Sequence, residues 1–292
     1  MKYFFDYDAI IFSNWPYNKK IEKLLKKRIK PNYLLATEGP TIDKNTWKKS
    51  NHLYFKKVFT WDDSLVNSDR NKYIKINFPC YKEKNYKTNF KKKKFLISIS
   101  SNKKNSHIND LYRERLAFIN WAEKNNFFEF DFYGFGWNKY LTDNKYLLKF
   151  LSTFKFLNFL FIKKYKNYKG EYYGIKQNLM KKYKFAICFE NSKNYNGWVT
   201  EKIFHCFFSG CVPIYYGAKN ISNIIPQNCY IDYKMFKNKK KLILYLQSLT
   251  DKDLDLFKKN IFSYLQSKKF NENFTLEVFF KTVFNEIKKD LK

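Results

Sequence analysis

The segment FAICFENSKNYNGWVTEKIFHCFFSGCVPIYYGA at residues 185–218 decides the fold. Its first apolar run ends at Glu190–Ser192, and a polar loop containing Gly197 follows. Thr200–Lys202 then opens an amphipathic stretch that ends at Gly210, before the second apolar run, Val212–Tyr216. This order predicts strand, loop, helix and strand, the repeating unit of a parallel sheet.

The start of the expected helix is a candidate anion site. Thr200 suits the N-cap and Glu201 suits the first turn. Free backbone N–H groups, the positive end of the helix dipole and the charge of Lys202 would together attract a phosphate. Glu201 can accept hydrogen bonds from a ribose diol, as acidic residues do at other nucleotide sites. On these residues alone, a routine helix cap with a solvated ion pair is an equal interpretation.

The same alternation of strand-like and helix-like patterns extends in both directions. A first series covers strands at 8–13, 32–37 and 57–61 with a helix at 19–30, and a polar stretch, Tyr81–Lys94, interrupts it. A second series begins at Phe95–Ser100 and ends in two or three terminal helices. We therefore expect an α/β protein with two Rossmann-like domains, 1–88 and 89–292, and a ligand at the carboxyl ends of the strands.

Composition narrows the class of protein. The 292 residues are 45% hydrophobic, which excludes a disordered chain. Fifty-seven Lys+Arg against 26 Asp+Glu give a net charge of +31, which draws the chain towards polyanions. Because the charge is spread along the chain, the aromatics fall in strand and helix runs and no nucleic-acid-binding signature appears, a nucleic-acid-binding protein is the less favoured hypothesis. The five cysteines form no CxxC pair and indicate buried thiols.

The motif FENSxxxxGWVTEKIFxCFFSGCVPIYYG closely resembles the donor-binding motif of the α-1,3-fucosyltransferase family. Further stretches resemble the same family in order: LLATEGP at 34–40, KVFTWDDSLV at 57–66, ISSN at 99–102, LYRERLAFI at 111–119, YGFGW at 133–137 and YKG at 168–170. The resemblance implies a GT-B fold with a cleft between the two domains. It also implies GDP-fucose as donor and inverting transfer without a metal or another cofactor.

The resemblance assigns the donor-binding residues one at a time. Glu201 matches the ribose-binding carboxylate, and Lys202 matches the lysine on the pyrophosphate. Asn191 matches an asparagine beside the donor, while Trp198 replaces a tyrosine that contacts the nucleotide and removes its hydroxyl. Arg115 matches the arginine on the β-phosphate.

Arginine is scarce in this chain, which strengthens the assignment of a phosphate-binding arginine to the helix at 108–124. Only four arginines stand among the 57 basic residues, and two of them, Arg113 and Arg115, lie in this helix. Arginine binds phosphate through a rigid two-pronged contact that lysine does not make. Arg113 is the alternative to Arg115, and a surface Arg–Glu–Arg cluster is the plainer interpretation of both.

Other positions complete the expected cleft. Glu38, the acid of the motif LLATEGP, matches the glutamate that accepts the proton of the acceptor hydroxyl. Asn102, Tyr133, Gly134 and Gly136 are expected to line the donor cleft. Asp62–Asp63 has no DxD spacing, and the three histidines do not cluster in the sequence, so we expect no metal site.

The first domain is short for a complete Rossmann-like half, because only seven residues precede the first expected strand. An inactive relative that still binds the donor is therefore an alternative to an active enzyme. We expect the acceptor to be an oligosaccharide or lipid-linked glycan, with fucose joined α-1,3 to N-acetylglucosamine or glucose of a surface glycan.

The expected cellular location rests on two kinds of segment that the sequence does not show, a signal peptide and a membrane span. The N-terminus shows no uninterrupted apolar segment of a signal peptide, and no stretch reaches about 18 uncharged apolar residues. The basic, aromatic segment 147–168 is expected to contact an anionic membrane face, with a core-facing helix pair as an equal interpretation. We expect a cytoplasmic protein, peripheral at the inner face of the membrane of a bacterial host or in a virus-infected cell.

Overall fold

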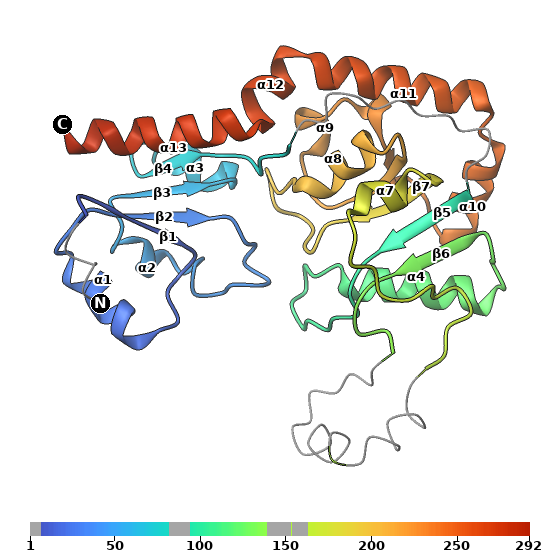
Figure 1. Cartoon of the computed structure of the whole chain (residues 1–292), viewed down its shortest axis with the longest axis horizontal. Coiled ribbons are helices and arrows are strands. Elements are labelled where there is room, and N and C mark those ends of the chain that lie inside the picture. Colours follow the sequence, from blue (N-terminus) through green and yellow to red (C-terminus); the bar gives the residue numbers. More distant parts are fainter. Residues whose placement is uncertain (1–6, 82–93, 139–152, 154–162) are drawn as a thin grey trace.

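Two parallel sheets lie side by side in the computed structural model (Figure 1). The structure describes residues 7–81, 94–138, 153 and 163–292. Most of segment 147–168, for which a membrane contact was predicted, lies outside these residues. No helix in the described part of the chain combines the length and apolar character needed to cross a bilayer.

The first sheet has the order β1-β2-β3-β4 and every pairing is parallel. Its strands are β1 (Ile10–Ser13), β2 (Asn32–Ala36), β3 (Lys57–Thr60) and β4 (Tyr73–Lys75). The connecting helices are α1 (Lys19–Lys27), α2 (Lys49–His52) and α3 (Asp63–Ser68). The sequence predicted the first three strands and α1. It gave no signal for β4, which has only three residues, all half-buried.

The second sheet is also wholly parallel, in the order β6-β5-β7-β8-β9. Its strands are β5 (Lys94–Ile99), β6 (Phe130–Tyr133), β7 (Tyr183–Phe189), β8 (Val212–Tyr216) and β9 (Ile231–Asp232). The order changes direction at β5 and β7, since the chain first adds β6 on one side and then β7 on the other. Such a switch point is where open α/β sheets bind ligands, at the carboxyl ends of the strands.

Helices cover both faces of this second sheet. They are α4 (Tyr112–Lys124), α7 (Lys176–Met180), α8 (Glu201–Phe208), α9 (Ile221–Ile224), α10 (Lys239–Ser248) and α11 (Asp251–Gln266), with short 3-10 turns η2 (Gln227–Cys229) and η3 (Tyr233–Met235). One core cluster packs α8 and α11 on the sheet, and another packs α4 and α10 on it. Burial of both faces explains why the strands read as continuous apolar runs.

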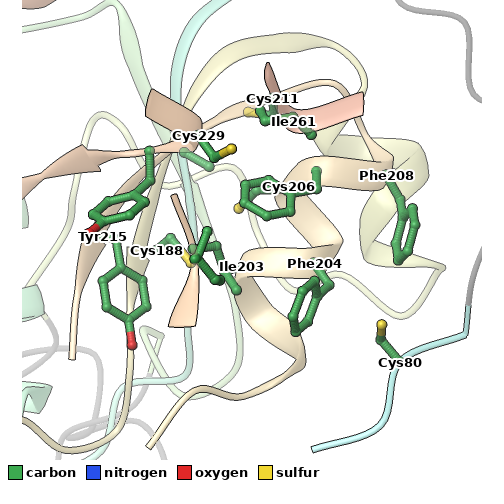
Figure 2. Close-up of a cluster of buried hydrophobic side chains, with 14 of the residues drawn as sticks. Cys80, Cys188, Ile203, Phe204, Cys206, Phe208, Cys211, Tyr215, Cys229 and Ile261 are labelled. Atoms are coloured by element: carbon green, nitrogen blue, oxygen red, sulfur yellow. The ribbon is translucent and has the colours of Figure 1, made fainter. Parts of the chain in front are cut away.

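The cysteines belong to the core cluster under α8 (Figure 2). All five are buried thiols that form no disulfide within the described residues: Cys80, Cys188, Cys206, Cys211 and Cys229. The prediction of buried thiols is confirmed. Burial raises the pKa of the Cys229 thiol to about 12, so this group stays protonated and unreactive at neutral pH.

The C-terminal helices carry the chain back to the first sheet. In Figure 1, α12 (Lys268–Phe274) and α13 (Leu276–Leu291) continue from α11 along one side of the molecule. Val283 and Ile287 of α13 are buried in one cluster with Tyr33 and Phe59 of the first sheet. The sequence division placed the terminal helices in the second domain, whereas α13 contributes to the core of the first.

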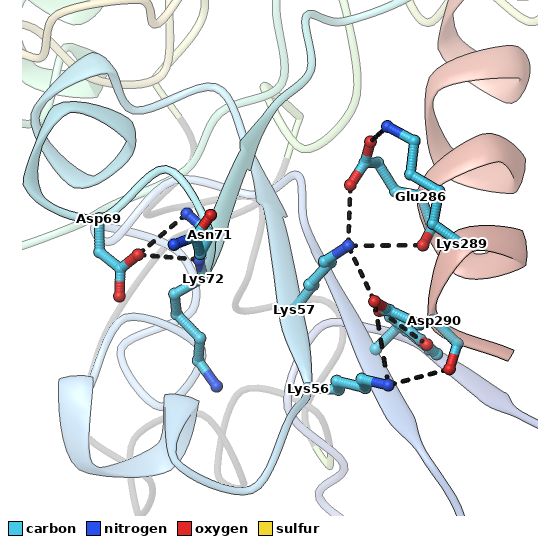
Figure 3. A network of polar contacts seen from close by, with 9 residues as sticks. Lys56, Lys57, Asp69, Asn71, Lys72, Glu286, Lys289 and Asp290 are labelled. Carbon is cyan, nitrogen blue, oxygen red and sulfur yellow. Dashed lines mark hydrogen bonds and ion pairs between the residues drawn. The ribbon is translucent and has the colours of Figure 1, made fainter. Parts of the chain in front are cut away.

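Ion pairs fix the end of α13 on this sheet (Figure 3). Lys57 Nζ of β3 lies 2.8 Å from Glu286 Oε2 and 3.1 Å from Asp290 Oδ1. The hydroxyl of Tyr33 donates to Asp290 Oδ2 at 3.1 Å. Asp290 and Lys57 are each only 13% exposed, so these contacts are shielded from solvent more than ordinary surface pairs.

Candidate active site

A cavity of about 180 Å³ opens at the carboxyl ends of β5 and β7. Its walls are residues 97–101 at the end of β5 and residues 186–189 at the end of β7. Side chains from α4 and α8 reach into it from two sides. Beyond residues 97–101, the polar lining residues are Lys103, Tyr112, Arg115, Lys176, Asn191, Lys202 and His205.

Arg115 is the cation on the α4 side. Its side chain is buried, and Nη2 donates to the main-chain oxygens of Phe189 at 2.7 Å and Glu190 at 2.6 Å, and to Asn191 Oδ1 at 3.1 Å. Burial lowers the pKa of Arg115, but a guanidinium titrates so far above neutral pH that it stays charged. A fixed cation therefore sits at the end of β7, beside Asn191.

Arg113, the alternative to Arg115, faces elsewhere. Its Nε donates to Asp110 Oδ2 at 2.8 Å, its Nη2 donates to the main-chain oxygen of His107 at 3.0 Å, and its side chain is 64% exposed. Asp110 also accepts from the backbone N–H of Tyr112 at 2.9 Å and so caps the start of α4. Arg113 does not line the cavity, whereas Arg115 does.

Lys202 is the cation on the α8 side, and a buried carboxylate holds it. Its Nζ lies 3.1 Å from Glu190 Oε2 and 2.9 Å from Thr200 Oγ1. Burial lowers the pKa of Lys202, but the charges of Glu190 and Glu201 outweigh that effect and raise the pKa overall. Lys202 is therefore protonated at neutral pH, with 29% of its side chain exposed.

The carboxylate of Glu190 holds the N-terminal end of α8 in place through hydrogen bonds to Thr200 and Lys202. This carboxylate accepts from the backbone N–H of Thr200 at 2.9 Å and from its hydroxyl at 2.7 Å, in addition to Lys202. Glu190 is fully buried, and Gly217 leaves room for it, since a Cβ there would lie 2.4 Å from Glu190 Cγ. Thr200 occupies the N-cap position as predicted, but its side chain makes no capping hydrogen bond.

Sequence reasoning did not assign a role to Glu190. The signal was present, because an acid directly after an apolar strand is costly to bury unless a cation or a set of donors faces it. Lys103, Lys176 and His205 were also missed as lining residues of the cavity. Lysine is so frequent in this chain that neither of these two lysines stands out.

Glu201 and Trp198 lie outside the wall of the cavity. Glu201 is half-buried in the first turn of α8. Burial raises the pKa of its carboxyl, but the charge of Lys202 and other nearby groups lower it overall, so Glu201 is ionised at neutral pH.

Trp198 packs between the two domains. It is 1% exposed, and its ring centre lies 4.6 Å from that of Trp61 and 5.4 Å from that of Phe78. Gly39 fits beneath it, because a Cβ there would approach the indole to 3.2 Å. The indole N–H of Trp198 has no hydrogen-bond partner among the described residues.

Glu38 follows β2 in the first domain. Its main-chain oxygen accepts from Trp47 Nε1 at 2.7 Å, which fixes the loop. Within the described residues its half-exposed carboxylate forms no hydrogen bond or ion pair. Burial raises the pKa of Tyr112, and the charge of Glu38 raises it further. Because Tyr112 lines the cavity, Glu38 lies near its mouth without forming its wall.

The loop after β6 packs against the segment after β5 that forms one wall of the cavity. Gly134 has a φ of 141°, and a Cβ on it would lie 2.1 Å from the main-chain oxygen of Ser100. Asn102 Nδ2 donates to the main-chain oxygen of Gly136 at 3.1 Å, and Tyr133 lies 3.3 Å from the Tyr183 hydroxyl. None of Asn102, Tyr133, Gly134 and Gly136 lines the cavity. Ser100 does line it, and the N–H of Ser100 donates to the main-chain oxygen of Tyr133 at 2.9 Å.

The paired aspartates have structural partners. Asp62 accepts from the N–H groups of Ser64 and Leu65 and caps α3. Asp63 pairs with Lys75 at 2.6 Å and accepts from Asn220 Nδ2 at 2.9 Å, a contact between the domains. Among the described residues, no group of three or more His, Cys, Asp or Glu side chains is arranged to hold a metal ion.

Comparison with known proteins settles the family. The profile of "Glycosyltransferase family 10 (fucosyltransferase) C-term" matches residues 88–282, about two thirds of the chain. The chain belongs to this family. The resemblance read from the sequence is thereby confirmed.

Matches to curated relatives are partial. The chain is 35% identical to the α-(1,3)-fucosyltransferase FucT of Helicobacter pylori over 115 residues, which are 37% of this chain and 24% of the relative. It is also 35% identical to an Arabidopsis thaliana α-(1,4)-fucosyltransferase over 85 residues, 29% of this chain and 21% of the relative. The chain thus aligns with about a quarter or less of the length of these relatives.

Solved structures share the fold over almost the whole chain. A crystal structure of an α1,3-fucosyltransferase aligns with 97% of this chain and 78% of its own, with a TM-score of 0.62 and 17% identity. A crystal structure of an α1,3-fucosyltransferase with GDP-fucose aligns with 97% and 90%, with a TM-score of 0.57 and 17% identity. The predicted GT-B class, with two Rossmann-like domains, is confirmed.

Proposed function

We propose that this chain transfers fucose from GDP-fucose to a hydroxyl of a glycan acceptor, with inversion at the sugar. One observation carries the proposal: Arg115 and Lys202 converge from α4 and α8 on one cavity at the switch point of the sheet. Two fixed cations and the N-terminus of α8 suit a diphosphate. Membership in the fucosyltransferase family supports GDP-fucose as its source.

The size of the cavity indicates which part of the donor it takes. Pockets that enclose a whole ligand measure about 300–1,000 Å³. A volume of about 180 Å³ suits the diphosphate. The guanosine and the fucose would then lie outside it, with Glu201 near the nucleoside end and Asn191 beside the diphosphate.

In the proposed reaction the acceptor oxygen attacks C1 of fucose on the side opposite GDP. The bond between C1 and the β-phosphate oxygen breaks, and GDP leaves with the bonding electrons. Arg115 and Lys202 neutralise the charge that develops on the leaving group. Their positions are fixed in advance by Phe189, Glu190 and Asn191, so little reorganisation is needed during the reaction.

Glu38 is the proposed base. Its carboxylate has no partner among the described residues, so it is available to accept the proton of the acceptor hydroxyl. It lies on the first domain, and its charge acts on Tyr112, which lines the cavity of the second domain; this supports the assignment. Membership in the fucosyltransferase family supports our proposal of an α-1,3 linkage to N-acetylglucosamine or glucose. We also propose that no metal ion takes part, since the two cations and the N-terminus of α8 supply the positive charge.

The test measures GDP release from GDP-fucose with a panel of β-galactosyl and N-acetylglucosaminyl acceptors, in the presence of EDTA. Glu38→Gln removes the proposed base, and we expect kcat to fall about 10²–10⁴-fold with GDP affinity unchanged. Lys202→Ala removes a charged contact to the diphosphate, and we expect GDP to bind about 10–100-fold more weakly in calorimetry. Glu277→Gln, at an exposed position on α13, is the matched control.

The outcomes separate the alternatives. GDP-fucose binding without acceptor-dependent or hydrolytic GDP release would identify an inactive, donor-binding relative. Absence of GDP binding in calorimetry would contradict the assignment of the cavity. Dependence of GDP release on a metal ion would contradict the proposed role of the two cations.

A further inference from the structure

A second cavity, of about 530 Å³, lies between the two domains and adjoins the first. On one wall it has Thr41 and Lys44, from the loop after β2. On the other it has Lys103–Ser106, after β5, together with Tyr112, Arg113 and Leu116 of α4. In Figure 1 these two loops face each other between the sheets. We call this cavity the interdomain groove.

The interdomain groove is strongly cationic. Lys44, Lys103, Lys104 and Arg113 line it, and no carboxylate is among its described lining residues. Two acids that neighbour lining residues, Asp110 and Asp43, already have partners. Asp110 is buried and holds Arg113 and the start of α4, while Asp43 accepts from Tyr17 at 2.6 Å and from Thr46.

Two of these cations have no partner among the described residues. Lys44 and Lys103 are exposed, and neither makes a hydrogen bond or ion pair with a described residue. They stand on opposite domains, so their charges add across one space instead of spreading over a surface. Arg113, one of four arginines in the chain, also lines this groove, with its exposed guanidinium paired to Asp110.

The walls of the interdomain groove are held together. Asn105 Nδ2 of the second domain donates to the main-chain oxygen of Thr41 of the first at 2.7 Å. The hydroxyl of Thr41 is also hydrogen-bonded to that of Ser192, next to Asn191 at the donor cavity. The groove is therefore a built feature of the closed pair of domains and does not depend on how a single surface lysine is placed.

The groove leads to the reaction centre. Lys103 and Tyr112 line both this groove and the 180 Å³ cavity. Glu38, the proposed base, acts on the pKa of the same Tyr112. A molecule in the groove thus reaches the point where the acceptor hydroxyl must lie.

We infer that the acceptor carries an oxyanion, a phosphate or a carboxylate, on or beside the sugar that receives fucose, and that Lys44, Lys103 and Arg113 bind it. This inference rests on the proposed function, because it names the class of acceptor for that site. A neutral glycan leaves two cations, Lys44 and Lys103, in the interdomain groove without a counter-charge from the described residues. An oxyanion on the acceptor supplies that charge next to the reacting hydroxyl.

The test compares matched pairs of acceptors that differ by one anionic group. N-acetylglucosamine 1-phosphate is paired with methyl N-acetylglucosaminide, and methyl glucuronide with methyl glucoside. The first pair tests a phosphate and the second a carboxylate. Binding to the GDP-saturated chain is measured by calorimetry, so that the sugar phosphate does not enter the donor cavity, and kcat/KM is measured where turnover occurs.

We expect the charged member of at least one pair to bind about fivefold or more tightly than its neutral partner, with the preference falling as ionic strength rises. Lys44→Glu abolishes the preference. Lys48→Glu is the control, since Lys48 is exposed on the same segment, outside the groove, and gives the same change in net charge. Arg113→Lys keeps the charge and preserves part of the preference.

Two results would overturn the inference. One is equal affinity for both members of each pair, or no binding by any charged sugar, in a chain that binds GDP-fucose. The other is an equal loss of preference in Lys44→Glu and Lys48→Glu, which would attribute the effect to net charge alone. Failure of the proposed function is distinguished by loss of GDP binding itself, which the calorimetry records first.

Discussion

Replacing Glu190 by glutamine tests the construction of the donor site. The carboxylate is fully buried and accepts from three donors: the Thr200 N–H, the Thr200 hydroxyl and Lys202 Nζ. A glutamine of the same shape keeps one oxygen for the Thr200 N–H. Its amide nitrogen replaces the oxygen that faces Lys202, so a cation meets a donor instead of an acceptor.

The magnitude follows from these contacts. A hydrogen bond to a charged group contributes about 1.5–3 kcal/mol, and removing one partner of a buried ion pair costs about 3–5 kcal/mol. Because the Lys202 side chain is 29% exposed, water compensates part of the loss. We therefore expect Glu190→Gln to lower the free energy of unfolding by about 2–3 kcal/mol and the unfolding midpoint by about 5 °C.

The assay is thermal and denaturant unfolding without nucleotide, because bound GDP would stabilise the folded state and mask the difference. Glu277→Gln is again the control: an exposed first-turn glutamate of α13 whose replacement should change stability by less than about 0.5 kcal/mol. If Glu190→Gln unfolds at the same midpoint as Glu277→Gln, then the Glu190 carboxylate does not hold Thr200 and Lys202 in place.

Two further predictions concern the surroundings of these groups. Gly217→Ala would place a Cβ 2.4 Å from Glu190 Cγ and 2.6 Å from the Tyr215 hydroxyl, and we expect a loss of about 1–3 kcal/mol in denaturant unfolding; Gly174→Ala, whose nearest atoms belong to the movable Tyr172 side chain, should lose less. Burial lowers the pKa of His52 below its usual 6.5, so folding favours the neutral ring. Its stabilising contribution is present above pH 6.5 and is lost as pH falls below it, and an unfolding series from pH 7.5 to 5 should show a smaller decline in His52→Gln than in the parent chain.

Local sequence patterns determined most of the strands. Apolar runs at 130–133 and 212–216 coincide with β6 and β8, and α8 begins one residue after its predicted N-cap. These elements follow from short-range rules, since both faces of the sheet are buried and each run is bounded by turn residues. Strand β4 was not predicted, because its three half-buried residues carry no periodic signal.

The site was predictable as a set of residue types, and its geometry was not. Arg113 and Arg115 are two positions apart on one helix and therefore point to different sides of it, but the sequence does not say which side faces the sheet. The structure puts Arg115 against the end of β7 and Arg113 in the interdomain groove. The sequence likewise does not say which of Glu201 and Lys202 reaches the cavity, and in the structure only Lys202 lines it.

By itself, the sequence determined the α/β class, the family motif and the residues that can bind a diphosphate, because these depend on local pattern and side-chain chemistry. Tertiary structure decided which cations meet, what holds them and which sheet α13 completes. Those outcomes depend on contacts between residues far apart in the chain, such as Arg115 with Phe189, Asn105 with Thr41 and Lys57 with Glu286. No periodicity records such contacts, since they form only when two finished elements pack and exclude water between them.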